Sequence, residues 1–301
     1  MTKHSDIEAA AQAAPAIETN RPAPTTKAGG TGQGAPAGGD SHAAAEAAIR
    51  SAFADGRAFI PFLTCGDPDL ETTAQLVRAL AGAGADLIEL GIPFSDPTAE
   101  GPVIQDADLR ALASGTTTDA VLDMTARLHE QVSVPLVYMT YANVIFSYGA
   151  ERFCRRAAQA GVSGIIVPDC PFEERDEFAD ACAAAGIVQI YMIAPTSHER
   201  IHAIASEARG FLYCVSSLGV TGTRAAIGTD VGAMVAAVRQ VSDIPCAVGF
   251  GISTPAQARQ MADQADGAIV GSAIVKLIAQ HGRQAAGPVA AFARQMKDAL
   301  R

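Results

Sequence analysis

The sequence contains no tryptophan, and its aromatic content is only 5%. It also lacks any apolar run of the roughly 18 residues that a membrane-spanning helix needs, so no membrane span is predicted. An excess of positive charge is absent as well, because 32 acidic side chains outnumber 22 basic ones and give a net charge of −10. This balance argues against nucleic acid or an anionic membrane surface as a partner. The N-terminus has the features of neither a secretory signal nor an organelle transit peptide, so we predict a cytoplasmic protein.

Paired cysteines and clustered histidines are missing too. The six cysteines include no C-x-x-C pair, so neither a zinc ribbon nor a redox motif is indicated. Most of them lie in apolar runs, which predicts small buried residues in a reducing compartment. His198 and His202 share a helical face, but no third ligand is apparent. A solvated helix face is the favoured interpretation, and no metal site is predicted.

What the sequence does contain changes abruptly near Asp40. Residues 1–40 are rich in alanine, glycine, proline and threonine and have few large apolar side chains. Such a segment cannot bury enough surface to offset the entropy cost of ordering its backbone, so we predict a disordered extension. Residues 41–301 are predicted to form one folded domain, which begins with a helix capped by Ser41 and ended by Gly56.

After this first helix, short apolar runs alternate with amphipathic helical patterns. The runs are apolar at nearly every position, which indicates strands buried on both faces in a parallel sheet. The predicted strands are 58–64, 86–90, 135–140, 164–168, 188–193, 211–216, 244–249 and 267–271. The predicted helices between and after them are 69–83, 119–131, 150–160, 173–185, 197–207, 230–241, 255–265 and a last stretch from 272 onward.

Eight strand–helix units in a domain of this length match an α/β fold of the (β/α)8 TIM barrel type. A doubly wound open sheet is the alternative. That fold usually has a G-x-G-x-x-G turn after its first strand, where this sequence has TCGDPD. We therefore predict a single-domain barrel with its active site at the carboxyl ends of the strands.

A single acidic residue interrupts the second predicted strand. Glu89 lies between Ile88 and Leu90, and a carboxylate in such a run is costly to bury unless it is paired or protonated. Desolvation should raise the pKa of Glu89 toward the range useful for proton transfer. A structural glutamate bonded within the barrel is the competing interpretation. After the first strand, Asp67 fits a turn and helix cap better than a catalytic role.

The loops at the same end of the predicted barrel add further candidates. The long loop after the second strand carries Asp96 and Glu100 ahead of a Gly-Pro break. The last two strands end in glycine-rich turns, 249–253 and 271–273, each of which opens a helix. Backbone N–H groups at such turns form an anion site, and barrels frequently bind phosphate there. The loop 217–230 is interpreted as a mobile lid, with an ordinary surface loop as the alternative.

Six segments stand out when the chain is taken as a whole: FIPFLTCGDPD, ELGIPFSDPTAEGPVIQ, IVPDCPFEE, GVTGTR, GFGIS and GSAIVK. In this order and spacing they resemble the motifs of the tryptophan synthase alpha chain family. The resemblance extends from residue 45 to about residue 300. It implies a lyase that performs the retro-aldol cleavage of indole-3-glycerol phosphate into indole and glyceraldehyde 3-phosphate, a step of tryptophan biosynthesis.

The resemblance also implies roles for single residues. Glu89 matches the family's acid/base for the proton transfers, and Tyr213 matches a tyrosine that lines the site. Glu100 is assigned the indole N–H contact, although it stands where the family usually has Asp, in PTAEGP rather than PLADGP. The implied phosphate-binding residues are Gly222, Gly251, Gly271 and Ser272. Those around the indole pocket, for which barrel packing is an equal explanation, are Phe62, Tyr141, Ile166, Thr221 and Phe250.

The implied partner is the tryptophan synthase beta chain, in an α2β2 heterotetramer where indole passes directly between sites. Pyridoxal phosphate would belong to that beta chain, and no cofactor is expected here. Asp169 resembles a family aspartate that helps relay signals to the partner. Two alternatives stay open. One is a stand-alone lyase that releases free indole, and the other is a weakly catalytic barrel that serves as an allosteric subunit.

Overall fold

Parallel strands form the inner layer of the computed structural model, which describes residues 38–215, 231–249 and 251–301. Within these residues the strands are β1 Ala58–Thr64, β2 Ile88–Gly91, β3 Leu136–Met139, β4 Val162–Ile166, β5 Val188–Ile190, β6 Met192–Ile193, β7 Leu212–Val215, β8 Cys246–Gly249 and β9 Gly267–Val270. Their order in the sheet is β5-β4-β3-β2-β1-β9-β8-β7-β6, and every pair is parallel.

The sheet closes on itself at the fifth predicted strand. The predicted strand 188–193 is interrupted at Tyr191, so that β5 pairs with β4 while β6 pairs with β7. The backbone N–H of Tyr213 donates to the carbonyl of Tyr191 at 3.0 Å, which links the two ends of the sheet. The predicted (β/α)8 barrel is therefore confirmed, with one of its eight strands split in two.

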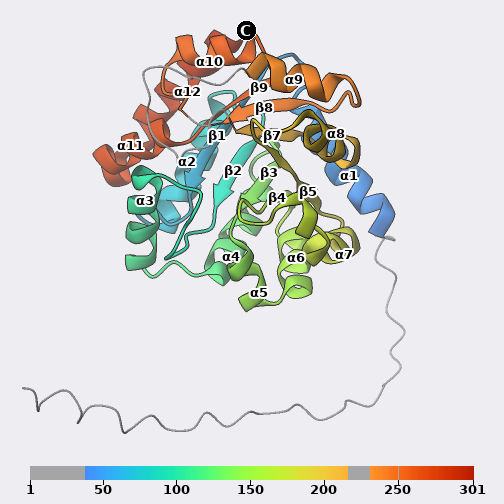
Figure 1. Ribbon diagram of the computed structural model, residues 1–301. Helices are drawn as coiled ribbons and strands as arrows, with labels where there is room; N and C mark the ends of the chain where they lie inside the picture. The colour runs from blue at the N-terminus through green and yellow to red at the C-terminus, as the bar shows by residue number, and fades with distance from the viewer. Residues whose placement is uncertain (1–37, 216–230, 250) are drawn as a thin grey trace, which may run out of the picture. The chain divides into compact units, whose positions relative to one another are not determined.

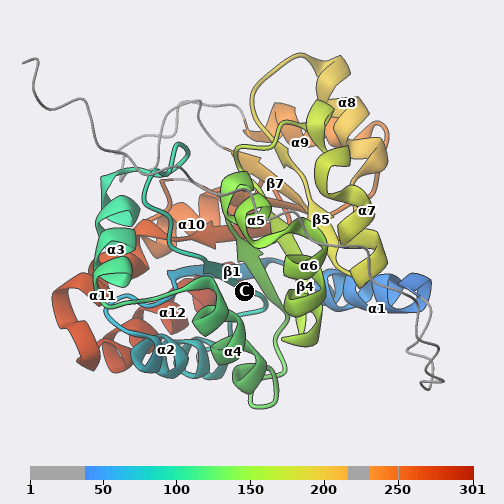
Figure 2. The ribbon, with the colours of Figure 1, turned by 90° about the horizontal axis from the view of Figure 1, so that it is seen from below.

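Helices surround this ring of strands (Figure 1), and the view from below shows the same outer layer (Figure 2). Within the described residues the α-helices are α1 Gly38–Ser51, α2 Leu70–Gly82, α3 Pro102–Ala113, α4 Thr118–His129, α5 Ala142–Tyr148, α6 Ala150–Gln159, α7 Asp176–Ala185, α8 His198–Glu207, α9 Val231–Arg239, α10 Pro255–Ala262, α11 Ser272–His281 and α12 Ala286–Leu300. Two short 3-10 helices, Phe172–Glu174 and Gly282–Gln284, precede α7 and α12. No helix in these ranges is long and apolar enough to cross a membrane.

The apolar side chains of the strands divide between two clusters. On β1, Phe59 and Leu63 pack outward against the helices, whereas Ile60 and Phe62 pack inside the barrel. This alternation follows from the period of two in a strand, which sends successive side chains to opposite faces. Because both faces are covered by apolar groups, both clusters bury their side chains from water, which is the main favourable term in folding.

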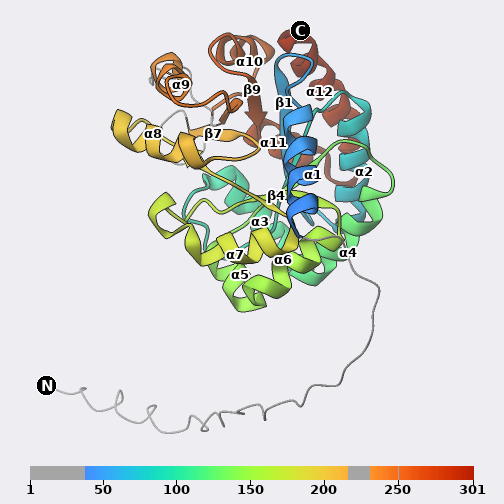
Figure 3. The same ribbon diagram turned by 90° about the vertical axis from the view of Figure 1, so that its right-hand side faces the viewer.

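Helix α1 closes the end of the barrel opposite the carboxyl ends of the strands. Ile49 of α1 is fully buried and belongs to the interior cluster together with Phe211, which precedes β7. The fit is close: a Cβ at Gly164 would lie 3.1 Å from Cδ1 of Ile49. Figure 3 shows α1 lying across this side of the strands. The helix begins at Gly38, so the predicted cap at Ser41 is wrong and Ser41 lies within the first turn.

Two helices were not anticipated from the sequence. Helix α3 begins with Pro102 at its first position and Gly101 at its N-cap, an arrangement that helices favour because proline lacks the N–H that a helix start leaves unpaired. The Gly-Pro pair, interpreted from the sequence as a break, is thus a helix start. Helix α5 has only seven residues, and its first N–H, of Ala142, donates to the carboxylate of Asp169 at 2.9 Å.

Candidate active site

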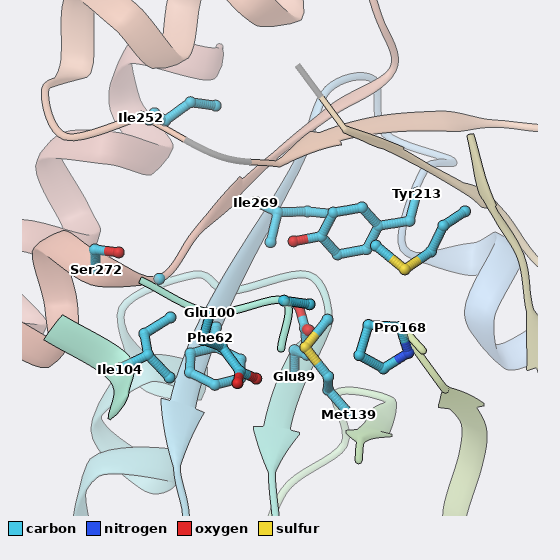
Figure 4. Close-up of a pocket in the computed structure, with 14 residues that line it drawn as sticks. Phe62, Glu89, Glu100, Ile104, Met139, Pro168, Tyr213, Ile252, Ile269 and Ser272 are labelled. Carbon is cyan, nitrogen blue, oxygen red and sulfur yellow. The ribbon is translucent and has the colours of Figure 1, made fainter. Parts of the chain in front are cut away.

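A cavity opens at the carboxyl ends of the strands and contains about 600 Å³ of empty space, part of it open to solvent. Figure 4 shows Glu89, Met139 and Tyr213 facing it, with Ile252 and Ser272 on the other side of the view. The residues that line it are Phe62, Glu89, Ala99, Glu100, Ile104, Met139, Pro168, Met192, Tyr213, Gly251, Ile252, Ile269, Gly271 and Ser272. The cavity thus has an apolar wall and few polar groups, as small-molecule sites do.

Glu89 is placed in the cavity by the register of β2. It stands opposite Phe62 of β1 on one side and Val137 of β3 on the other, and both of these neighbours point into the barrel. Only 1% of Glu89 is exposed, and neither carboxylate oxygen has a hydrogen-bond partner among the described residues. Burial, with a smaller contribution from the nearby Glu100, raises the pKa of Glu89 to about 8. No hydrogen bond from residues 38–215, 231–249 or 251–301 supports the competing interpretation of a glutamate bonded within the barrel.

Glu100 reaches the cavity from the loop between β2 and α3, which spans residues 92–101. The hydroxyl of Tyr141 donates to Oε2 of Glu100 and accepts the backbone N–H of Ala99 at 3.0 Å. The side-chain amide of Gln105 donates to the Glu100 carbonyl at 2.8 Å. Burial raises the pKa of Glu100 to about 7, the bond from Tyr141 opposes this rise, and Asp169 adds to it. Near neutral pH, Glu100 therefore holds a negative charge more readily than Glu89 does.

Tyr213 of β7 completes the polar part of the lining. It is 5% exposed, and burial followed by the charges of Glu89 and Glu100 raises the pKa of its hydroxyl well above the usual value. Tyr213 therefore stays protonated over the working range of pH. Its ring fits because residue 249 is glycine: a Cβ there would lie 2.4 Å from the Tyr213 hydroxyl oxygen.

The opposite side of the cavity is made of backbone at two turns. Gly251 has a φ of +83°, a conformation that glycine adopts without steric cost. Gly271 and Ser272 stand at the N-terminus of α11, where the carbonyl of Gly271 accepts the N–H groups of Ile274 and Val275 at 2.9 and 3.1 Å. The first amides of a helix lack partners within it and carry the positive end of its dipole. The two turns can therefore hold an anion without a lysine.

The remaining predicted site residues fall into three groups. Phe62 lies on the cavity lining. Tyr141 lies behind Glu100, with 2% of its surface exposed, and Ile166 is buried in the interior cluster without reaching the lining. Thr221, Gly222 and Phe250, together with the predicted lid 217–230, lie outside the described residues.

Most of the apolar lining was not identified from the sequence. The residues missed are Ala99, Ile104, Met139, Pro168, Met192, Ile252 and Ile269. Strand alternation could have found three of them, because Met139, Met192 and Ile269 occupy inward positions in β3, β6 and β9. Ile104 could not have been found, since the helix that carries it was not predicted.

Asp67, the other acidic residue considered at a strand end, is engaged by an arginine. It is 1% exposed, and its two carboxylate oxygens accept from Nε and Nη2 of Arg110 on α3, each at 2.8 Å. Such a two-pronged bond satisfies the carboxylate in place. The structure thus supports a structural role for Asp67, but as the partner of Arg110; the predicted helix cap is wrong, because Asp69 caps α2. No cluster of three or more metal-ligating side chains occurs in the described ranges.

Comparisons with known proteins agree with one another. The model of the family described as "Tryptophan synthase alpha chain" matches residues 50–301. The alpha chain of Lacticaseibacillus casei is 46% identical over 252 residues, which are 84% of this chain and 95% of that one. The alpha chain of Gloeobacter violaceus is 50% identical over 80% of this chain and 89% of its own length.

Solved structures show the same likeness in three dimensions. The alpha subunit from Legionella pneumophila superimposes with a TM-score of 0.76 at 35% identity, over 85% of this chain and 97% of that one. A chain from a structure described as the tryptophan synthase α2β2 complex of Pyrococcus furiosus gives a TM-score of 0.75 at 33% identity, over 81% of this chain and 98% of its own.

Proposed function

The chain belongs to the tryptophan synthase alpha chain family, and we propose that Glu89 and Glu100 carry out its reaction. This reaction is the retro-aldol cleavage of indole-3-glycerol phosphate into indole and glyceraldehyde 3-phosphate, a carbon–carbon lyase step of tryptophan biosynthesis. One observation carries the assignment. Glu89 is a buried carboxyl group whose two oxygens have no partner in the described part of the chain, and it lines the cavity at the catalytic end of the barrel.

Glu89 serves as the acid and then as the base. With a pKa of about 8 it carries a proton at neutral pH, which it donates to C3 of the indole ring. The carboxylate left behind accepts the proton of the glycerol hydroxyl next to the ring. As that proton leaves, the hydroxyl carbon becomes the aldehyde, the bond to C3 breaks, and its electron pair returns to the ring. The carboxyl group thus ends protonated, as it began, but with the proton of the glycerol hydroxyl in place of the one now on C3.

Glu100 stabilises the charge that this path creates. Protonation at C3 leaves the indole ring positive, so an anion at the ring N–H lowers the barrier. Glu100 is suited to this because Tyr141 donates to one of its oxygens and holds the side chain in place. A glutamate in place of the family's aspartate keeps the charge and extends its reach by one methylene group.

The phosphate of the substrate is assigned to the turns on the far side of the cavity. The backbone amides of Gly251, Gly271 and Ser272 and the positive end of the α11 dipole supply the attraction. A local site of this kind suits a chain whose net charge is −10, because the overall field does not favour an anion. From the resemblance, Gly222 joins these residues, and Thr221 and Phe250 join the indole wall.

Phe62, Met139 and Ile269 form the apolar surface against which an indole ring would pack, and Tyr213 borders it. This surface excludes water from the charged intermediate, which strengthens its interaction with Glu100. The proton transfers need only groups that this chain supplies, so we propose that the cleavage uses no metal and no cofactor.

The proposed partner is a tryptophan synthase beta chain, which would carry the pyridoxal phosphate. Support comes from the likeness to chains solved in tryptophan synthase complexes. In such an assembly the indole released here would be consumed by the partner, and the cytoplasm is the expected location for both.

The function is tested by assaying the purified chain with indole-3-glycerol phosphate, with and without a beta chain. Formation of glyceraldehyde 3-phosphate that the beta chain strongly stimulates supports the heterotetramer. High activity without the beta chain supports a stand-alone lyase. Absence of cleavage in both assays would contradict the proposed function and favour an allosteric subunit.

A further inference from the structure

A second cavity, which the mechanism does not use, lies next to the active-site cavity. It contains about 610 Å³ of empty space, part of it open to solvent. Two residues, Pro168 and Met192, line both cavities. Part of the wall of the second cavity is apolar and includes the rings of Phe172 and Tyr191, whose centroids lie 5.4 Å apart in an edge-to-face arrangement. Pro168 and Met192 therefore separate the active-site cavity from a space that could receive an apolar group.

These two residues stand where the wall of the barrel changes its pairing. Strand β4 ends at Ile166, which pairs with Ile190 at the end of β5. Past this level, Met192 of β6 pairs with Tyr213 of β7, and no backbone ladder joins β4 to β6 among the described strands. Pro168, which follows β4, has no N–H to donate to a neighbouring strand. Side chains thus close the wall at this point.

The indole end of the substrate would face this part of the wall. The phosphate is assigned to the turns beside Ser272, and Figure 4 shows Pro168 and Met139 on the side of the view away from Ser272. Met192 is next to Tyr213 by the pairing of their strands, and it packs against the interior cluster. In indole-3-glycerol phosphate the phosphate chain is attached at C3, so the six-membered ring of the indole is the part farthest from the phosphate.

We propose that Met192 is a specificity-determining residue for the lyase reaction: its side chain closes the active-site cavity toward the second cavity and so limits the size of a substituent on the six-membered ring of the indole. The proposal rests on the proposed function, since the bound phosphate sets the direction of the ring. Methionine is unbranched and has three rotatable bonds, so its removal or displacement opens the wall without a change of the backbone.

A matched pair of variants tests the role of Met192. Met192→Ala removes a side chain with the second cavity behind it, whereas Met139→Ala removes an identical side chain that lines the active-site cavity but not the second one. The probe is indole-3-propyl phosphate, which lacks the glycerol hydroxyls and cannot be cleaved. It is used unsubstituted, or with a hexyl chain at C5 or at C6 of the ring. A hexyl chain is longer than the space left by one methionine side chain, so it needs the second cavity.

The measured quantity is the Kd of each hexyl analogue divided by the Kd of the unsubstituted analogue, obtained by isothermal titration calorimetry. In the parent this ratio should be about ten or more for both isomers. Met192→Ala should lower it about tenfold or more for at least one isomer, because burying two methylene groups already changes a Kd by about this factor. Met139→Ala should lower it by less than about threefold. The kcat/KM ratios for the corresponding substituted indole-3-glycerol phosphates should change in the same direction.

The proposal is overturned if Met192→Ala leaves both ratios at the parental value, if Met139→Ala lowers them as much, or if the parent binds the hexyl analogues as tightly as the unsubstituted one. Thermal unfolding followed by circular dichroism establishes that each variant is folded. If Met192→Ala does not fold, Met192→Val takes its place with the same expectations. A parent that binds the unsubstituted analogue but cleaves no substrate would contradict the proposed function alone, because binding still tests Met192. A parent that does not bind the analogue would contradict both.

Discussion

Two neighbouring strand ends bury a carboxylate in opposite ways. At the end of β1, Asp67 is 1% exposed and receives two hydrogen bonds from Arg110. On β2, Glu89 is equally buried and has no partner in the described residues. Burying an ion without a partner costs several kcal/mol, so an unpaired acid takes up a proton instead. Asp67 therefore contributes to holding the structure together, whereas Glu89 keeps its proton near neutral pH, as its proposed role as an acid requires.

The largest expected effect follows from removing the proton that Glu89 carries. Glu89→Gln preserves shape and neutrality but cannot donate or accept the proton, so cleavage of indole-3-glycerol phosphate should fall at least about a hundredfold. Steady-state rates measured with the purified variant and a beta chain test this. Circular dichroism should show an intact fold, since Glu89 has no hydrogen bond to lose within the described part of the chain. Parental turnover by this variant would remove Glu89 from the mechanism.

At the end of β1, a substitution that breaks the pair of Asp67 and Arg110 should change the stability of the fold rather than the rate of the reaction. Arg110→Leu leaves Asp67 buried without its partner and should lower the free energy of unfolding by about 3 kcal/mol. Urea unfolding of the variant and the parent measures the difference. Converting Asp67 to Asn in the same chain removes the unpaired charge, so the double variant should recover part of the loss. An unchanged urea midpoint for Arg110→Leu would show that the ion pair contributes nothing.

Glu100 is intermediate between the paired Asp67 and the unpaired Glu89, since it has one hydrogen bond from Tyr141 and a pKa of about 7. Glu100→Ala removes the charge that is proposed to face the indole N–H and should reduce kcat about tenfold or more. Glu100→Asp keeps the charge, and the shorter side chain should retain most of the activity. The two variants are compared by kcat at pH 8, where the parent is ionised. Equal activity in both would exclude Glu100 from the reaction.

A feature could be predicted from the sequence where a local pattern of residues determines it, and could not where it depends on contacts between residues far apart in the chain. The barrel was predictable, because the apolar runs of strands buried on both faces are a local signal, and Glu89 stood out as a charge within such a run. Its lack of partners was not predictable, since it depends on side chains from other strands. The bond from Tyr141 to Glu100 joins residues 41 positions apart. The start of α3 was missed because Gly-Pro marks both loop ends and helix starts.

The remaining effect is a pH-dependent difference in stability caused by Glu89. Below pH 4.5 the group is protonated in the folded and the unfolded chain and contributes nothing. Between pH 4.5 and about 8 the unfolded chain loses the proton while the folded one keeps it, so the parent is destabilised as the pH rises.

Gln at this position does not titrate. The difference in unfolding free energy between Glu89→Gln and the parent should therefore be near zero at pH 4.5 and favour the variant increasingly up to pH 8. The rise in pKa bounds this gain at about 5 kcal/mol. At pH 6, where the folded chain keeps the proton and the unfolded chain has lost it, we expect about 2 kcal/mol. Urea unfolding at pH 4.5, 6 and 8 measures it, and Asp67→Asn is the paired-acid control. A gain that is the same at all three pH values would show that packing, rather than a retained proton, distinguishes Glu89 from Asp67.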